Sequence, residues 1–388
     1  MVKRTDSGGT SWVMLDTMRA WTAEGVLDAY MYANKSDAES THQWGAPRST
    51  GMQMDGTDGT TNASGGSYIY LAIRRSDGYV GKPAEVGTDV FTMDTGNNSA
   101  TIPCFDSGFP VDFALRKSTT AGWGTDDSKW RVIARLTQGK TLMTHVSDAE
   151  ATDSNIPIFD SNVGISKGDA SSFQAWMWKR HAGFDVVTDT SAEWVSHNLN
   201  RVPEMVIIKH RTVAENWFVW HKDFNGGGSN SIGYWVYLNG SSAESNAGNV
   251  CPIGNTLPTA THFQSDTDSA VRHADCIAFL FASVDGISKV GSYSGNGTGN
   301  SGGGTQTITT GFQPRFLIIK TRNVTGNWWV FDTTGGAWGT GFDQHLYLDG
   351  MDARFGGSVD SGEPTSTGFT VKHYMNTTNE SYIYYAHA

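Results

Sequence analysis

The sequence has few charged residues, few prolines and only three cysteines, and its cysteine content and charge balance argue against two classes of protein. Charged residues make up 17% of the 388 positions and prolines number 10, whereas glycines number 46. Cys104, Cys251 and Cys276 share no metal-ligand spacing, so neither a disulfide framework nor a zinc site is predicted. Basic residues number 28 against 39 acidic ones, and the net charge of -11 argues against a nucleic-acid partner.

Long apolar runs and helical periodicity are also missing. No apolar run approaches membrane-spanning length, so no membrane insertion is predicted. The nearest candidate for an amphipathic helix, TAEGVLDAYMYANKSDAE, is interrupted by Gly25. Glycine, serine, threonine, asparagine and aspartate are plentiful instead, which is typical of short strands joined by tight turns. We therefore predict an all-β fold.

One pattern occurs four times: an apolar start, a basic cluster, a small polar turn, then tryptophan and a second apolar stretch. The copies are MVKRTDSGGTSWVMLDT from Met1, VDFALRKSTTAGWGTDDSKWRVIARL from Val111, MVIIKHRTVAENWFVWHKD from Met205 and FLIIKTRNVTGNWWVFDTT from Phe316. This pattern predicts a β-hairpin whose turn varies in length. A third apolar stretch and a closing one follow each hairpin, as HLYLDGMDARF and ESYIYYAHA do in the last copy.

Each repeat spans roughly 80–110 residues, the size of a β-sandwich that can bury its own core. We predict tandem β-sandwiches, jelly-roll-like or immunoglobulin-like, arranged as beads in a row. The predicted domains are residues 1–85, a divergent second repeat at 86–190, and repeats at 191–295 and 296–388. The hairpins of the third and fourth repeats are each preceded by a further segment, whereas the first hairpin begins at Met1. We therefore expect a first sandwich that lacks one strand, has an exposed edge and belongs to a longer polypeptide.

A glycine-rich run, SGNGTGNSGGGTQTITTGF, separates the third and fourth repeats. A phosphate-binding loop needs Gly-Lys-Ser/Thr at the start of a helix, whereas Gly304 is followed by Thr-Gln-Thr. VVTDTSAEWVSHNLNRVP occupies the same place before the third repeat. We interpret both segments as linkers.

The tryptophans fall into two groups. One group recurs at a single hairpin position, which indicates packing in the core or between sheets. Its members are Trp12, Trp130, Trp217 and Trp328. The other group lies in glycine-rich or polar loops, and these are the candidates for glycan binding, because sugar rings stack on indole faces: Trp21, Trp44, Trp123 and Trp338. Loop tryptophans also cap sandwich ends or contact partner subunits, and that alternative stays open.

No catalytic constellation is evident. The acidic pairs Asp126–Asp127 and Asp266–Asp268 lie among serine and threonine, as turn residues do. The 11 histidines are scattered, and the GxSxG nucleophile motif is absent. We predict no catalytic residue, no metal site and no cofactor. Basic clusters recur at strand ends, where we favour a solvated position over contacts with an adjacent repeat. They are Arg74–Arg75, Lys179–Arg180, Lys209–Arg211 and Lys320–Arg322.

Several phrases of the chain resemble a tandem-repeat family found in tail-fibre-like and other virion proteins of marine bacteriophages. They include YIYLAIRRSDG, VSHNLNRVPEMVIIKHR, FASVDGISKVGSYSGNGT and GFQPRFLIIKTRNVTGNWWVFD. The resemblance implies a place on the virion surface and a role in structural display or host adhesion. It also implies a homo-oligomer, a trimer in the case of a fibre.

We therefore predict a non-enzymatic virion protein, part of a tail fibre, spike or surface decoration. Its predicted partners are other virion proteins, and a host-surface glycan is a candidate ligand. Two alternatives stay open. One is a carbohydrate-binding array of a secreted bacterial enzyme, and the other is a spike that depolymerises capsule or lipopolysaccharide.

Overall fold

The structure is a computed structural model that describes residues 1–388 except 20, 22–26, 49–50, 74–83, 123, 138, 153–158, 247–250, 298–304, 340, 342 and 357–358. Within the described residues, the regular structure consists of short strands in antiparallel sheets and 3-10 helices of three or four residues. The predicted all-β fold is confirmed. The strands fall into four groups, which we call units 1 to 4.

Unit 1 holds the first seven strands. They are β1 (Val2–Arg4), β2 (Val13–Met14), β3 (Asp28–Tyr32), β4 (Ser40–His42), β5 (Gly45–Arg48), β6 (Gly51–Met54) and β7 (Tyr68–Tyr70). Five of them form one sheet in the order β4-β3-β2-β1-β7, while β5 and β6 form a separate ribbon. The hairpin predicted from Met1 is the pair β1–β2, in which Val2 lies opposite Val13.

Units 2, 3 and 4 hold the remaining strands. Unit 2 contains β8 (Phe91–Thr95), β9 (Phe105–Asp106), β10 (Phe113–Ser118), β11 (Arg131–Ala134), β12 (Lys140–Met143), β13 (Ala151–Thr152), β14 (Gly164–Ile165) and β15 (Phe173–Trp178). Unit 3 contains β16 (Phe184–Thr188), β17 (Trp194–Ser196), β18 (Met205–His210), β19 (Phe218–His221), β20 (Val236–Tyr237), β21 (His262–Gln264) and β22 (Cys276–Phe281). Unit 4 contains β23 (Ser288–Ser294), β24 (Gln306–Thr309), β25 (Phe316–Thr321), β26 (Trp328–Asp332), β27 (Gln344–Tyr347), β28 (Phe355–Gly356), β29 (Pro364–Thr365), β30 (Gly368–Val371) and β31 (Ser381–His387).

One strand order is common to the large sheets of units 2, 3 and 4. The orders are β8-β15-β10-β11-β12-β13, β16-β22-β18-β19-β20 and β23-β31-β25-β26-β27-β28. In each, the last strand of the unit lies between the first strand and the predicted hairpin. A small second sheet accompanies each large one, namely β9–β14, β17–β21 and β24-β30-β29. Unit 1 has the same order without a first strand beside β7 among its described residues.

Each large sheet is buried on both faces. In unit 4, Tyr382 and Tyr384 of β31 pack with Phe369 of the small sheet in one apolar cluster. Ile383 and Tyr385 point to the opposite face of the same strand and belong to a second cluster that also contains residues of units 2 and 3. The sandwich core of each unit therefore accounts for only one face of its large sheet.

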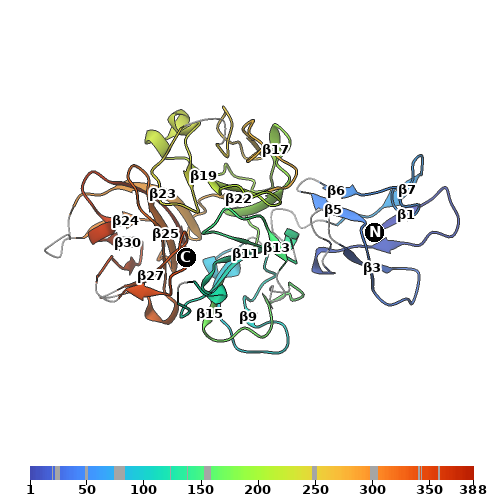
Figure 1. Cartoon of the computed structure of the whole chain (residues 1–388), viewed down its shortest axis with the longest axis horizontal. Helices are drawn as coiled ribbons and strands as arrows, with labels where there is room; N and C mark the ends of the chain where they lie inside the picture. Colours follow the sequence, from blue (N-terminus) through green and yellow to red (C-terminus); the bar gives the residue numbers. More distant parts are fainter. Residues whose placement is uncertain are drawn as a thin grey trace.

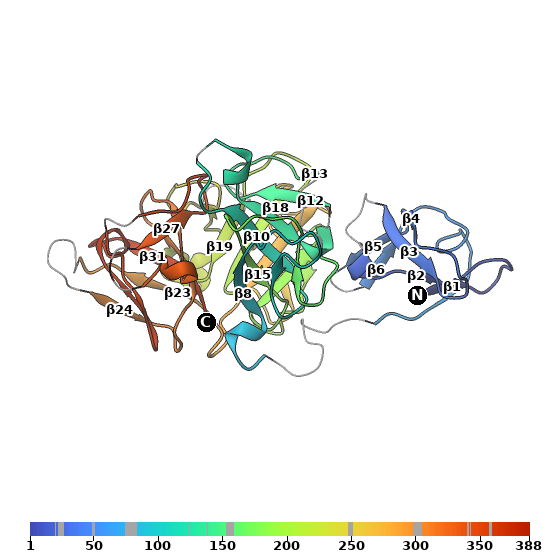
Figure 2. The ribbon, with the colours of Figure 1, turned by 90° about the horizontal axis from the view of Figure 1, so that it is seen from below.

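The second faces meet at a common centre, so that units 2, 3 and 4 form a closed ring rather than the predicted row of beads. Figure 1 shows the three units around this centre, with unit 1 apart at one side. In the perpendicular view of Figure 2, unit 1 again stands beside the ring, with its β5–β6 ribbon on the side nearer to it. A row would leave three apolar faces in water, and the ring buries all three against one another.

The strands just before two predicted domain boundaries, and the glycine-rich segment interpreted as a linker, belong to the units that follow them. β16 lies before residue 191 but pairs along its whole length with β22 of unit 3. β23 lies before residue 296 but pairs with β31 of unit 4. β24, inside the glycine-rich run, pairs with β30. Gly302–Gly304 lie outside the described residues.

Several histidines are buried in this fold. Burial lowers the pKa of His181 and His221 to about 3 and that of His145 and His345 to about 4. The pKa of His387 is also well below its usual value, chiefly because of burial. Each therefore stays neutral in the folded protein at a pH where an unfolded histidine, with a pKa of about 6.5, takes up a proton.

We predict that the free energy of unfolding falls as the pH drops below about 6.5, because the unfolded state then binds more protons. Each such histidine contributes up to about 1.4 kcal/mol per pH unit. Asp343 and Asp349, whose pKa values burial raises to about 6, oppose this trend but are fewer. Urea denaturation at several pH values between about 7 and 5 measures the slope.

His345→Phe is the matched variant, because His345 packs against Trp329 and Phe355 with ring centroids 4.3 Å apart in both pairs. The variant should reduce the pH slope by up to about 1.4 kcal/mol per pH unit. A free energy of unfolding that is constant over this pH range would contradict the prediction.

Candidate functional site

The ring is closed by one hydrogen bond that recurs at each interface between units, which we call a seam. The indole Nε1 of Trp217 in unit 3 donates to the carbonyl oxygen of Met143 in unit 2, at 2.9 Å. Trp328 of unit 4 donates to Tyr237 of unit 3 at 2.8 Å. Trp130 of unit 2 donates to Tyr347 of unit 4 at 2.7 Å, across 217 residues of sequence. The three bonds run in one direction around the ring.

The β-ladders explain why these tryptophans are equivalent. Each tryptophan lies at the start of the second hairpin strand or immediately before it. The residue after each tryptophan pairs, within its own unit, with the residue whose carbonyl accepts the indole of a neighbouring unit. These pairs are Arg131–Met143, Phe218–Tyr237 and Trp329–Tyr347. Each unit therefore carries the donor and the acceptor at fixed positions on one face of its sheet. A donor and an acceptor set side by side in this way favour a head-to-tail ring.

A buried lysine accompanies each tryptophan. Lys320 lies opposite Trp328 in the ladder, and the same register places Lys117 and Lys209 opposite the other two tryptophans. The ammonium group of Lys117 donates to the carbonyl of Met351 across the seam at 3.0 Å, and that of Lys320 donates to Ser241 at 3.0 Å. Burial lowers the pKa of all three lysines to about 8.

Two seams also carry an ion pair. Arg211 of unit 3 binds both carboxylate oxygens of Glu150 in unit 2, at 2.8 and 2.9 Å. Arg322 of unit 4 binds Glu244 of unit 3 at 2.5 Å. The backbone amides of the two glutamates donate to the carbonyls of the same arginines, at 2.6 Å in both cases. The solvated position favoured for the clusters Lys209–Arg211 and Lys320–Arg322 is wrong, because Arg211 and Lys320 are buried and bind the neighbouring unit. Arg74–Arg75 lies outside the described residues.

The third seam, between units 2 and 4, has a different charge pattern. Arg354 takes the position of the glutamate, and its amide donates to the carbonyl of Thr119 at 2.8 Å. Its guanidinium pairs with Asp332 of its own unit at 2.7 Å and donates to Gln174 of unit 2 at 2.8 Å. The backbone hydrogen bond is therefore common to all three seams, whereas the ion pair is not.

The centre of the ring is nearly filled by apolar side chains. A cavity of about 40 Å³ lies there, which is close to the volume of one water molecule. Its lining comes from all three units: Phe113, Leu115, Val132, Thr144, Trp178, Met205, Ile207, Trp217, Leu238, Phe279, Phe281, Ile318, Leu348 and Tyr385. The centre holds the units together and has no room for a sugar or a nucleotide.

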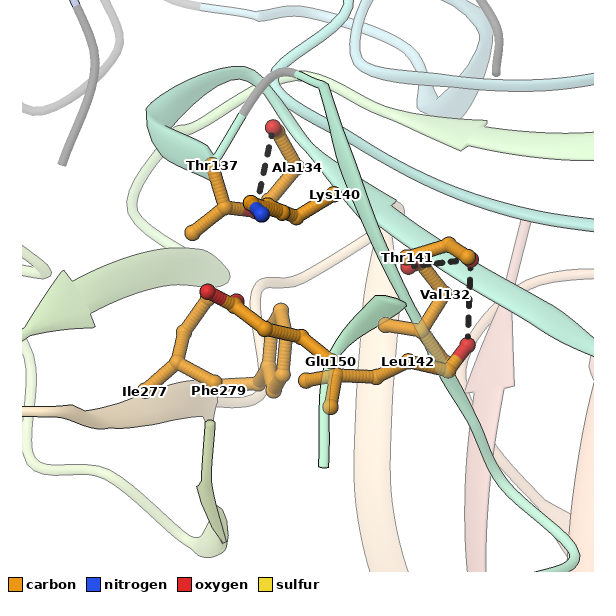
Figure 3. A pocket seen from close by; sticks show the side chains of 9 residues that line it. All are labelled: Val132, Ala134, Thr137, Lys140, Thr141, Leu142, Glu150, Ile277 and Phe279. Carbon is orange, nitrogen blue, oxygen red and sulfur yellow. Dashed lines mark hydrogen bonds between the residues drawn. The ribbon is translucent and has the colours of Figure 1, made fainter. Parts of the chain in front are cut away.

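A second crevice opens at the seam between units 2 and 3, as Figure 3 shows. It is lined by Val132, Ala134 and Leu142 of unit 2 and by Ile277 and Phe279 of unit 3, among others. It has no space for even a water molecule. Its one carboxylate, Glu150, is already bound by Arg211. This crevice is part of the packing between units.

The structure places the four loop tryptophans differently from one another. Trp44 and Trp338 are both 3% exposed. Trp338 donates to the carbonyl of Gly362 at 2.9 Å, and Trp44 packs edge-on against Tyr30 at 5.1 Å. A sugar cannot stack on an indole face that protein atoms cover, so packing accounts for these two. Trp21 is half-buried and donates to the carbonyl of Gly45 at 3.1 Å, and Trp123 lies outside the described residues.

The acidic pairs have local partners. Asp126 pairs with Lys129 at 3.0 Å and with Arg131, and these bonds lower the pKa of its carboxyl group. Asp268 accepts from the amide of Ala270 at 2.8 Å, as a turn residue does. In the described part of the chain, no group of three or more His, Cys, Asp or Glu side chains is arranged to hold a metal ion. The described residues also contain no helix long and apolar enough to span a membrane.

A family model described as a domain of unknown function (DUF7483) matches residues 1–76 and 160–388. The match therefore includes the hairpin of unit 1 and resumes ahead of the closing strand of unit 2. No curated protein matches the chain.

We predict that Trp217→Phe destabilises the ring by about 1–3 kcal/mol, because it removes the indole donor and leaves the Met143 carbonyl unpaired at the buried seam. Urea denaturation followed by circular dichroism measures the loss. Trp194→Phe is the control, since Trp194 is 43% exposed and should change stability by less than about 0.5 kcal/mol. Equal stability of the two variants would contradict a role for the seam hydrogen bond.

We also predict that Trp338→Ala costs about 3–5 kcal/mol of stability, the range for removing a large buried side chain. A glycan-stacking residue would instead leave stability unchanged and lose ligand affinity. Thermal unfolding of this variant and of Trp21→Ala separates the two roles. Unchanged thermal stability in Trp338→Ala would show that its indole is not a core residue.

Proposed function

Because the family match covers most of its length, the chain belongs to the DUF7483 family, and we propose that it is a non-enzymatic structural protein of a bacteriophage virion. In this role it forms part of a tail fibre, a spike or a surface decoration. Its partners are other virion proteins, and a host-surface glycan is a candidate ligand. The resemblance of its repeats to tail-fibre-like proteins is the starting point of this proposal.

The observation that carries the proposal is the closed ring. Its largest side chains are used to join the units: Trp130 and Trp217 bridge seams, and Trp178 contacts the hydroxyl of Tyr385 in another unit at 3.3 Å. Four cations also bind neighbouring units: Lys117, Arg211, Lys320 and Arg322. A molecule whose aromatic and charged groups are used in this way suits a rigid building block.

Rigidity of this kind fits a particle that persists outside cells. Buried seams and closure of the ring oppose local opening of the strands of units 2, 3 and 4, and local opening is what proteases require. The net charge of -11 favours solubility of an exposed surface. These properties support display on a virion.

We predict that antibodies raised against the purified chain label intact particles of the phage that encodes it in immunogold electron microscopy. Label on the tail would support an adhesin or fibre, and label spread over the head would support a decoration. Serum depleted on immobilised chain is the control. Antigen that stays in the supernatant when the particles are pelleted would overturn the proposal and favour a secreted carbohydrate-binding protein.

A further inference from the structure

Unit 1 exposes a row of apolar side chains on its last strand, β7, and on the three residues that follow it. Ile69, Leu71 and Ile73 are 49%, 51% and 88% exposed. They alternate with Tyr70 and Ala72, so they share one face of the sheet. The strand continues the ladder beyond β7, because the amide of Leu71 donates to the carbonyl of Met1 at 3.0 Å. Three large apolar residues on one exposed face mark an interaction surface.

The register shows which face this is. Val2 pairs with Val13 and with Tyr70, as Ile319 pairs with Trp329 and with Tyr384 in unit 4. Counting along the strands, Leu71 corresponds to Tyr385 and Ile73 to His387.

The same count gives the counterparts in units 2 and 3. Leu71 corresponds to Trp176 and Phe279, and Ile73 corresponds to Trp178 and Phe281. All six of these counterparts are at most 5% exposed, because they face the centre of the ring.

The polar parts of a seam are present in unit 1 as well. Trp12 precedes Val13 and corresponds to the three tryptophans that bridge the seams. Tyr32, which pairs with Val13, corresponds to the acceptors Met143, Tyr237 and Tyr347. In unit 1 both residues are only half-buried.

The lysine of the seam is also in place. Lys3 donates to the carbonyl of Thr10, as Lys117 donates to Ser128 and Lys320 to Gly326. The acceptor lies two residues before the seam tryptophan in each case. Lys117 and Lys320 additionally reach a carbonyl of the neighbouring unit, at 3.0 Å in both cases. Lys3 is poised to do the same with a neighbour.

We propose that unit 1 assembles with unit 1 of two further copies of this chain, in the same cyclic arrangement that units 2, 3 and 4 adopt. The face used consists of Lys3, Trp12, Tyr32, Leu71 and Ile73, which we call the Trp12 face. In each contact, Trp12 of one copy donates to the carbonyl of Tyr32 in the next. The chain thereby becomes a homotrimer.

Closure after three copies follows from the ring itself. Copies joined by a head-to-tail interface form a closed ring when the rotation from one copy to the next is a whole fraction of a full turn. Otherwise they continue into a filament. The seams of units 2, 3 and 4 close after three units, with donor and acceptor at the positions that unit 1 repeats. The same interface between separate copies of unit 1 therefore closes at three.

The seam between units 2 and 4 is the best model for the contact. There the carbonyl of Thr119 accepts the amide of Arg354 without an ion pair across the same position. Thr5 of unit 1 corresponds to Thr119, and Glu39 lies seven residues after Tyr32, as Arg354 lies seven after Tyr347. An amide of Glu39 donating to Thr5 of the next copy would complete the contact.

The experiment measures the mass of the purified full chain by size-exclusion chromatography with light scattering. The wild-type chain should have three times the 42.0 kDa mass of one chain. The double variant Leu71→Asp/Ile73→Asp should fall to the mass of one chain, because it introduces charges where three units meet. Both side chains are exposed within one chain, so the variant should keep the wild-type circular dichroism.

Tyr70→Asp is the matched control, because Tyr70 lies on the same strand, is 67% exposed and points to the other face. It should remain trimeric. Ala33→Trp is a second disrupting variant for the case in which the double variant misfolds: Ala33 is exposed and follows Tyr32, as Leu348 follows Tyr347 at the crowded centre. A wild-type chain that is monomeric or dimeric overturns the inference, and so does a trimer that survives the disrupting variants.

Assembly through this face does not depend on the virion role. Labelling of particles tests that role, and the mass of the purified chain tests the trimer. Either proposal can fail while the other stands.

Discussion

The ring depends on the need to cover a second apolar face on each large sheet. One face packs against the small sheet of its own unit, and the other has no partner within the unit. Three units solve this by turning those faces toward one centre, where Trp178 packs against Phe316 of unit 4 at 5.5 Å and Phe281 packs against Tyr385 at 4.8 Å. Apolar burial supplies the driving force, and the seams supply the geometry.

The seams fix the orientation and spacing of neighbouring units, because their buried polar groups need hydrogen-bond partners at defined distances. A buried indole N–H is stabilised by an acceptor, and a backbone carbonyl accepts it only near 3 Å. A buried ammonium such as Lys320, bound by carbonyls of units 3 and 4 at 3.0 and 2.6 Å, would be costly to leave unpaired. A rotated or shifted unit would lose these bonds together, so one arrangement is favoured.

The sequence was sufficient to predict the all-β class, the four hairpins and the structural character of the recurring tryptophans. It did not predict the ring, because a two-residue period shows which side chains share a face but not what covers that face. The interpretation of the charged clusters was wrong for a related reason. Lys209 and Arg211 look like solvated strand ends as long as unit 3 is considered alone, because the partner of Arg211, Glu150, lies in unit 2. A signal of this pairing was present, since Glu150 and Glu244 recur in aligned turns while Arg211 and Arg322 recur in aligned hairpins.

Covalent linkage explains why one seam of the ring tolerates a weaker polar contact. Units 2, 3 and 4 are joined in one chain, so the last seam closes intramolecularly, at an effective concentration that short linkers raise to the millimolar range. The seam between units 2 and 4 can therefore hold with a backbone hydrogen bond and without an arginine–glutamate pair. Copies of unit 1 in separate chains have no such linkage, and their association would have to come from the apolar Leu71 and Ile73 instead. The exposure of those two side chains in a single chain is what such a concentration-dependent contact requires.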